Sequence, residues 1–191
     1  EKEPGKPVLC DIRTSRGVTE YVAKLGGVPH LWKVGHAFAK VKLRELGAIV
    51  GGELAGHYYF RDFFCCDSAF LCAMLVLGVA AKVKQEGRSF SDLLKAIDPY
   101  ANTGECNYTI EEKDAAINAV IEAAKQEFGE PSVFLDFDGV RCEWPTWWFN
   151  IRKSNTEPYL RLVAEAQTEN ELAERKAFVE NVLKAFIRKG N

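Results

Sequence analysis

The chain has 191 residues, of which 47% are hydrophobic and 27% charged, and its formal net charge at pH 7 is −2. These fractions are typical of a globular protein, and the length suits one large domain or two small ones. The basic residues are scattered along the sequence, which argues against a nucleic-acid-binding surface. The longest apolar run, Ala69 to Ala81, is shorter than the roughly 20 residues that a membrane span needs. We therefore expect a buried core helix there and no membrane association.

The sequence contains six cysteines, and none of them forms a Cys-x-x-Cys pair. Most lie inside apolar runs, which is typical of buried reduced thiols in a cytoplasmic protein and not of disulfides or a metal site. The chain begins with Glu1 and carries a single methionine, Met74, without a secretory signal pattern. We expect either a processed protein or the C-terminal part of a longer one.

The first half of the chain alternates between strand and helix patterns. We expect strands at 7–12, 28–34 and 48–50, and helices at 18–25 and 37–46, the second ending at the C-cap Gly47. This order predicts an α/β domain with a mixed, mostly parallel sheet and flanking helices. Ligands bind such sheets at the carboxyl ends of the strands, where we place Arg13, His36 and the segment after Val50.

That segment is a glycine-rich loop, Gly51 to His57, followed by the strand-like residues 58–60. Glycines on both sides permit a sharp turn from which Glu53 projects. A carboxylate accepts hydrogen bonds through both oxygens, so Glu53 could receive two neighbouring hydroxyls of a sugar ring. The alternative is an exposed glutamate on an ordinary glycine turn.

Two more helices should follow, one from 67 to 84 with Asp67 or Ser68 as its N-cap, and one from 92 to 97 capped by Ser91. The turn-rich stretch after them, Asp98 to Gly104, predicts a domain boundary. We therefore expect two domains, 1–98 and 99–191, with a hinge at residues 99–104.

The second domain begins with an expected strand at 105–110 and a helix at 111–128. That helix carries one apolar stripe, formed by Ala116, Ile117, Val120, Ile121 and Ala124. Asp138-Gly139 is a strong hairpin signal, further strands are expected around 147–151 and 160–164, and Thr168 should cap a last helix, 169–188. This order predicts an α+β domain with an antiparallel sheet and helices on one side.

The loop between the last two strands is rich in hydrogen-bond donors. Arg152 supplies a planar fork that matches two phosphate oxygens, and the hydroxyls of Ser154 and Thr156 can donate to a third. These residues favour an anion as the ligand. Ser, Thr and Asn are also common turn residues, so a plain polar hairpin turn is the alternative.

The whole string R-x-S-N-T-E-P at 152–158 resembles the phosphate-binding loop of the α-D-phosphohexomutases, in the phosphomannomutase/phosphoglucomutase branch. Asn155 favours this branch, because the phosphoglucosamine branch usually carries glycine there. The glycine-rich loop is similar to the family's sugar-binding loop G-E-x-S-G-H, with Ala55 in place of its serine. Gly35-His36 and Lys40 resemble a G-H-x-x-x-K stretch of the same family.

The resemblance covers nearly the whole chain and implies the family's third domain at 1–98 and fourth domain at 99–191. It implies that a set of substrate-binding residues divides between the two domains, with three further candidates. The substrate-binding residues are Arg13, His36, Glu53, Arg152, Ser154, Asn155 and Thr156, and the further candidates are Lys40, His57 and Arg161.

The implied activity is that of an isomerase, a phosphomannomutase or phosphoglucomutase that interconverts hexose 1-phosphates and 6-phosphates through a bisphosphate. The family's phosphoserine loop and its D-G-D-G-D-R metal loop do not occur in these 191 residues. The resemblance therefore implies no catalytic or metal-binding residue here, and an inactive fragment. Mg²⁺, the phosphoserine and a hexose 1,6-bisphosphate would act in a parent protein with two preceding domains, in the cytoplasm. A non-catalytic sugar-phosphate binding module, a scaffolding fragment and a phosphoglucosamine mutase are the alternatives.

Overall fold

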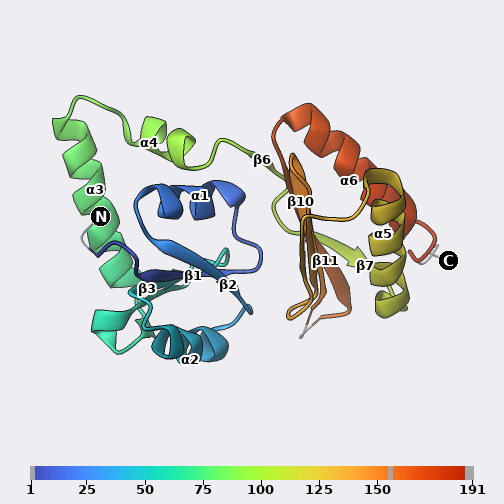
Figure 1. Ribbon diagram of the computed structural model, residues 1–191, viewed down its shortest axis with the longest axis horizontal. Helices are drawn as coiled ribbons and strands as arrows, with labels where there is room; N and C mark the ends of the chain where they lie inside the picture. Colours follow the sequence, from blue (N-terminus) through green and yellow to red (C-terminus); the bar gives the residue numbers. More distant parts are fainter. Residues whose placement is uncertain (1–2, 155–156, 188–191) are drawn as a thin grey trace. The chain divides into compact units, whose positions relative to one another are not determined.

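A computed structural model of the chain describes residues 3–154 and 157–187. The chain divides into two compact units, Glu1–Pro99 and Tyr100–Asn191. Both units combine one sheet with helices, as Figure 1 shows.

Unit 1 contains a five-stranded sheet in the order β2-β1-β3-β4-β5. Strand β1 runs parallel to β2 and β3, whereas β4 and β5 add in antiparallel fashion. The mixed α/β fold expected from the sequence is therefore confirmed. The elements of unit 1 are β1 (Pro7–Asp11), α1 (Arg16–Lys24), β2 (Val28–Trp32), α2 (His36–Leu46), β3 (Val50–Gly52), β4 (Tyr58–Phe60), the 3₁₀ helix η1 (Arg61–Phe63), β5 (Cys66–Asp67), α3 (Ala69–Gln85) and α4 (Phe90–Ile97).

Helices α1 and α2 lie on opposite sides of this sheet (Figure 1). Helix α2 packs closely, because a Cβ at Gly51 on β3 would lie 2.8 Å from Leu43 Cδ1 and 3.1 Å from Leu9 Cβ. A glycine is therefore needed at this position of the strand. The expected cap Gly47 is confirmed, since it ends α2 in the left-handed conformation at φ 61°. Strand β3 begins two residues later than expected, because Ala48 N–H still bonds to Leu43 O behind the helix.

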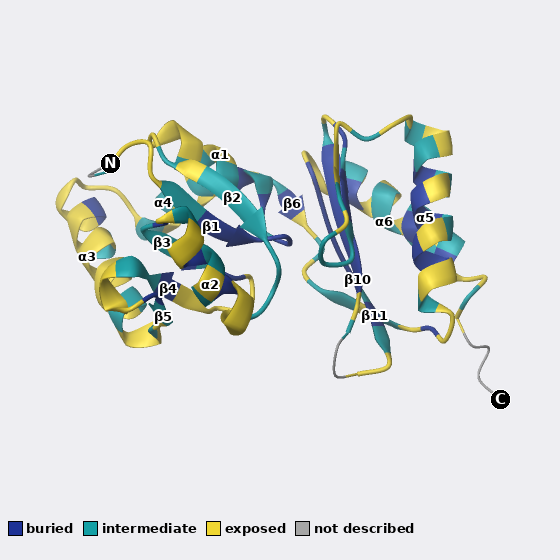
Figure 2. Ribbon diagram, turned by 60° about the horizontal axis from the view of Figure 1, so that its bottom comes forward, coloured by how far each residue is buried: buried dark blue, intermediate teal, exposed yellow. Residues whose placement is uncertain are grey.

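Helix α3 differs from the expectation in its burial. Ser68 caps it as expected, but most of its side chains are exposed, with Phe70 79% and Leu77 64% accessible (Figure 2). The predicted core helix is therefore wrong in its burial, since an all-round apolar pattern does not identify a covering surface. No helix in the described parts of the chain is long and apolar enough to cross a membrane.

Helix α4 is capped two residues earlier than the sequence suggested. Ser89, and not Ser91, has extended backbone angles, and its Oγ accepts a hydrogen bond from Asp92 N–H at 3.1 Å. Both serines precede the same apolar face, so the sequence offered two caps and the first one forms.

Unit 2 contains a fully antiparallel sheet in the order β6-β11-β10-β9-β8, with β7 also paired to β11. Helices α5 and α6 lie together on one side of it (Figure 1), which confirms the expected α+β fold. The elements of unit 2 are β6 (Ala101–Asn102), β7 (Cys106–Thr109), α5 (Lys113–Phe128), β8 (Val133–Leu135), β9 (Val140–Glu143), β10 (Trp147–Lys153), β11 (Tyr159–Ala166) and α6 (Glu169–Leu183).

Alternation along β10 divides its side chains between the two faces of the sheet. Trp147, Phe149 and Ile151 join the core beneath the helices, so Arg152 lies on the opposite face. The predicted stripe of α5 is confirmed, because all five of its residues are buried in this core. Thr168 caps α6 as expected, and the helix itself ends at Leu183.

The segment that joins the two units is less free than the expected hinge. Ala101 and Asn102 pair with β11, and Thr103 N–H bonds to Ala164 O at 2.9 Å. These residues are part of the sheet of unit 2, so the expectation of a hinge over the whole of 99–104 is wrong. Backbone rotation is left to the residues before Ala101.

The Asp138-Gly139 turn is a hairpin between β8 and β9, as predicted. Gly139 has φ +62°, and a Cβ on it would lie 2.4 Å from Ile151 O and 2.7 Å from Arg152 Cα. The turn therefore lies directly against the part of β10 that carries Arg152. Only glycine satisfies both the backbone angle and the close approach.

We expect Gly139→Ala to lower the free energy of unfolding of unit 2 by about 3 kcal/mol. The left-handed angle costs about 1–2 kcal/mol and the clash about 1–3 kcal/mol. Gly104→Ala is the control, because Gly104 has φ +63° with nothing within 4 Å of its Cβ position. Urea unfolding followed by tryptophan fluorescence measures both, since three of the four tryptophans belong to unit 2. Equal losses in the two variants would contradict the predicted clash.

Candidate functional site

A buried carboxylate organises the carboxyl end of β1. Asp11 Oδ1 accepts from Arg13 N–H at 2.6 Å, and Oδ2 accepts from Arg13 Nη2 at 2.7 Å. Oδ2 also accepts from Leu54 N–H at 2.8 Å, which ties the end of β1 to the loop after β3. Asp11 and Arg13 are 2% and 4% exposed, and their pairing orients the guanidinium.

Glu53 lies in the same place but does not project from its loop as expected. It is 8% exposed, and its two oxygens accept from Tyr59 Oη at 2.5 Å and from Gly35 N–H at 3.2 Å. Burial, followed by the hydrogen bond to Glu53, raises the pKa of Tyr59, so the phenol stays protonated and donates. Glu53 is therefore held in one orientation by the backbone and by its neighbouring strand.

The structure brings three of the predicted sugar-binding residues to one edge of the sheet. The bond from Gly35 places Glu53 beside the start of α2, where His36 is exposed. The bond from Leu54 to Asp11 places the same loop beside Arg13. Lys40 lies one helical turn after His36 and is partly buried. This is the edge at which parallel strands present their ligands.

His57 forms an ion pair that the sequence did not predict. Its Nδ1 lies 2.6 Å from Asp67 Oδ2, and Asp67 Oδ1 accepts from Tyr58 N–H at 2.9 Å. The hydrogen bond to Asp67 is the main cause that raises the pKa of His57. Burial alone would raise the pKa of Asp67, but the bonds from His57 and Tyr58 lower it. The pair uses Nδ1, so Nε2 is the ring nitrogen that can serve a ligand.

In unit 2, Arg152 and Arg161 are directly opposite each other on β10 and β11. Arg152 Nη2 is 3.2 Å from Glu105 Oε2, and Arg161 Nη1 is 3.1 Å from Glu105 Oε1. Arg161 Nη2 also meets Glu157 at 2.6 Å. The Nε atoms of both arginines are buried, and in the part of the chain that the structure describes they have no hydrogen-bond partner. The fork predicted to meet a phosphate thus faces a carboxylate in this structure.

The loop after β10 is a hairpin connection. Ser154 N–H bonds to Tyr159 O at 2.9 Å, and Ser154 Oγ accepts from Glu157 N–H at 3.2 Å. Asn155 and Thr156, which we predicted to bind phosphate, lie outside the described residues. This geometry is expected both for an ordinary polar turn and for an anion-binding loop. The hairpin therefore does not decide between these two interpretations of the loop.

Four residues of these networks are absent from the sequence prediction of the site: Asp11, Tyr59, Asp67 and Glu105. Asp67 was considered only as a helix cap, and Tyr59 only as part of a strand. Asp11 lies near the end of the expected strand 7–12, and a polar residue at a strand end is the one signal that could have identified it. The others pair with residues distant in the chain or in a neighbouring strand, and the sequence carries no sign of that pairing.

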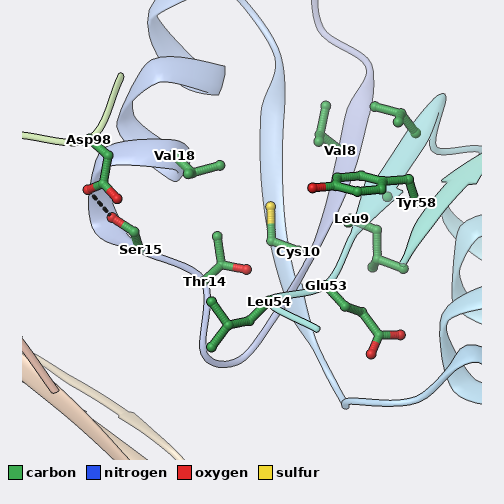
Figure 3. Close-up of a pocket in the computed structure, with 13 residues that line it drawn as sticks. Val8, Leu9, Cys10, Thr14, Ser15, Val18, Glu53, Leu54, Tyr58 and Asp98 are labelled. Carbon is green, nitrogen blue, oxygen red and sulfur yellow. Dashed lines mark hydrogen bonds between the residues drawn. The ribbon is translucent and has the colours of Figure 1, made fainter. Parts of the chain in front are cut away.

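Unit 1 also contains an apolar pocket of about 340 Å³ against one face of its sheet, shown in Figure 3. Its wall includes Val8, Cys10 and Tyr58, and Ser15 donates to Asp98 at 2.7 Å on one side. Figure 3 shows the side chain of Glu53 directed away from Ser15 and Asp98. The charged residues of the wall are carboxylates, so the pocket disfavours an anionic ligand.

No group of three or more His, Cys, Asp or Glu side chains among residues 3–154 and 157–187 could hold a metal ion. The described residues therefore provide hydrogen-bond donors and acceptors, one ion-paired histidine and two opposed arginines. Such groups bind and orient a polar anionic molecule and can exchange a proton with it.

We expect Asp67→Asn to return the pKa of His57 toward its ordinary value of about 6.5. The wild-type pKa lies above that value because the carboxylate favours the imidazolium. NMR titration of the histidine ring protons measures this shift. His30 is the internal control, because burial lowers its pKa without Asp67. An unchanged His57 titration in the variant would show that the pair does not form in solution.

Two family models match the chain, one in each half of the sequence. The model for "Phosphoglucomutase/phosphomannomutase, alpha/beta/alpha domain III" matches residues 1–100, and the model for "Phosphoglucomutase/phosphomannomutase, C-terminal domain" matches residues 105–182. The two matches together cover both structural units.

Similar proteins are named for the same activity. "Phosphohexose mutases" of Xanthomonas campestris is 38% identical over 96% of this chain and 40% of its own length. "Phosphomannomutase" of Escherichia coli is 37% identical over 92% of this chain and 38% of its own length. A phosphoglucomutase/phosphomannomutase family protein of Burkholderia thailandensis has a solved structure that matches with a TM-score of 0.80 and 30% identity, over 96% of this chain and 38% of that one.

The chain thus spans about two fifths of the length of the relatives it matches. Each family match covers most of one structural unit, and the similarity extends over nearly the whole chain. The chain belongs to the phosphoglucomutase/phosphomannomutase family and comprises its domain III and its C-terminal domain.

Proposed function

We propose that this chain is the substrate-binding part of a phosphohexomutase that interconverts hexose 1-phosphates and hexose 6-phosphates through a bisphosphate. The observation that carries the proposal is the joining of Glu53 to the loops after β1 and β2, through Leu54–Asp11 and Gly35. These bonds gather a fixed carboxylate, a guanidinium and a histidine at the ligand edge of a parallel sheet. Membership of the family supplies the reaction class.

The sugar half of the proposed site is in unit 1. Each oxygen of Glu53 already accepts one hydrogen bond, and a carboxylate oxygen can accept a second. Glu53 can therefore receive sugar hydroxyls without leaving its position, while Arg13, His36 and Lys40 provide donors for hydroxyl or phosphate oxygens. Ala55 offers no hydroxyl, so one contact that the family's sugar loop usually makes is missing.

The phosphate half of the proposed site is in unit 2. Arg152 and Arg161 provide guanidinium donors, and Ser154 a hydroxyl, with Asn155 and Thr156 as further donors of the same loop. Holding the phosphate that does not react leaves the other end of the sugar for phosphoryl transfer. Positioning of this kind can supply roughly 7–11 kcal/mol of the barrier.

His57 is suited to the proton transfer in this reaction. A sugar hydroxyl that accepts a phosphoryl group loses its proton as the new P–O bond forms and the donor oxygen–phosphorus bond breaks. Neutral His57 could take this proton at Nε2, because Asp67 holds the ring through Nδ1 and stabilises the imidazolium that results. The raised pKa makes the imidazole a stronger base, because the Asp67 carboxylate favours its protonated form.

This chain spans about two fifths of the length of its relatives, and the phosphoserine and the Mg²⁺ site of the proposed reaction would belong to the preceding domains of a longer protein. Mg²⁺ would neutralise charge on the transferring phosphoryl group. The roles of the residues described here are binding, orientation and proton transfer, and the proposed setting is the cytoplasm. The further partner is the pair of preceding domains.

We expect Arg152→Ala to weaken the binding of glucose 1,6-bisphosphate by about 10- to 100-fold, because a charge-assisted fork is worth about 1.5–3 kcal/mol. Isothermal titration of the chain measures this loss. Lys153→Ala is the matched control, because this substitution also removes one positive charge. Lys153 is the next residue along β10, but its side chain lies on the other face of the sheet and pairs with Asp114. Equal affinity in wild type and Arg152→Ala would refute the phosphate site.

We expect the chain alone to convert no glucose 1-phosphate, because none of its residues carries the phosphoserine or the metal. A coupled assay for glucose 6-phosphate, with bisphosphate and Mg²⁺ added, measures the conversion. The positive control is the Xanthomonas campestris relative. Turnover that co-purifies with the chain through several columns would contradict the proposed division of roles.

A further inference from the structure

The two arginines of unit 2 are in an unfavourable arrangement by themselves. Arg152 and Arg161 are directly paired across the antiparallel strands β10 and β11, so their side chains lie on the same face. Like charges in this arrangement repel each other. Another residue must therefore hold the two guanidinium groups together.

Glu105, which lies next to a third strand of the sheet, holds the two guanidinium groups together. It comes just before β7, which pairs with β11 so that Asn107 is opposite Arg161. Each carboxylate oxygen meets a different arginine, Oε2 with Arg152 at 3.2 Å and Oε1 with Arg161 at 3.1 Å. One negative charge thus bridges two positive charges.

The bridge leaves hydrogen-bonding capacity unused. The side chain of Arg152 is 6% exposed and that of Arg161 is 20% exposed, and neither Nε has a hydrogen-bond partner among the described residues. Buried donors without acceptors are costly. The group of three residues therefore has a surplus of positive charge and of donors, which a phosphate oxyanion would satisfy.

We propose that Glu105 is the internal counter-ion of the phosphate site and competes with phosphate for Arg152 and Arg161. This inference rests on the proposed function, because it takes Arg152 as a phosphate ligand. Without phosphate, the carboxylate keeps the two arginines together on the face of the sheet. With phosphate, the same donors face two anions, and the carboxylate lowers the affinity.

A reduced affinity fits the proposed reaction. A bisphosphate that gives up either of its phosphoryl groups must present each end to the reacting serine in turn, so the distant phosphate has to be released and bound again. Without Glu105, Arg152 would face the dianion with no carboxylate beside it, and the site would hold the dianion more tightly and slow this exchange. Glu105 limits the affinity while it preserves the geometry.

The test is titration of the full chain with inorganic phosphate, followed by the NMR signals of the arginine Nε–H groups. Glu105→Gln keeps the size and one acceptor oxygen but removes the charge. We expect it to bind phosphate about tenfold more tightly than wild type, and the Nε–H signals of Arg152 and Arg161 to shift on binding. Glu157→Gln is the matched control, because Glu157 is exposed and meets Arg161 alone; we expect a change of less than threefold.

Unchanged or weaker binding by Glu105→Gln would overturn the competition, since it would show that Glu105 only positions the arginines. Phosphate binding that persists in Arg152→Ala would instead refute the phosphate site itself, so the two failures can be told apart. Glu105→Asp provides a second variant if the glutamine variant does not fold. This variant keeps the negative charge but moves it away from the arginines by the length of one methylene. We expect it to bind phosphate more tightly than wild type, by a factor of less than ten. Phosphate affinity equal to or below that of wild type would again overturn the competition.

Discussion

A carboxylate that is buried or partly buried needs hydrogen-bond donors, and this requirement organises the candidate binding groups of each unit. In unit 1 the donors to Asp11 and Glu53 come from Arg13, Leu54, Gly35 and Tyr59, which belong to four separate segments. In unit 2 the donors to Glu105 come from two neighbouring strands. Removal of any of these carboxylates would leave backbone or guanidinium donors unmatched, so the loops and the binding groups depend on the same charges.

The same contacts explain why a site made of loops can be well ordered. The loop after β3 is short, and its own turn is closed by Glu53 N–H to His57 O and by Gly56 N–H to Glu53 O, both at 2.9 Å. The side-chain bond of Glu53 to Gly35 then joins this turn to the start of α2. A ligand that meets Glu53 and His36 therefore finds both residues in place and does not have to order them.

Local patterns in the sequence predicted the parts of the fold that depend on local interactions. Gly47 and Thr168 were found as caps because capping acts within one helical turn, and the stripe of α5 was found because its period is that of a helix. The burial of α3 was mispredicted for the opposite reason. Its apolar residues indicate what the helix could bury, but which surface covers it depends on the tertiary arrangement.

The candidate site shows the same division. The motif at 152–158 could be identified from the sequence because its residues are consecutive. Glu53 and His36 could be identified for the same reason, since each lies within a short continuous motif. The residues that pair with such groups could not be identified from the sequence. Asp67 is separated from His57 by ten positions and Glu105 from Arg152 by 47, and these pairs meet through strand registers that no sequence pattern specifies. The sequence therefore predicted candidate binding residues, and the structure was needed to find the groups that oppose or orient them.

The His57–Asp67 pair shows how stability and proposed chemistry depend on pH in opposite ways. A histidine whose pKa is raised in the folded state stabilises it fully below the unfolded value of about 6.5, and this contribution is lost as the pH rises through the folded pKa. An aspartate whose pKa is lowered contributes above its unfolded value of about 3.8, and its contribution is lost as the pH falls. The pair is therefore most stabilising between these limits, when His57 is protonated.

A proton acceptor must be neutral, so the proposed base becomes effective over the pH range in which the pair ceases to stabilise the fold. Because His57 is about half exposed, solvent keeps the stabilising term small, and unit 1 can lose it without unfolding.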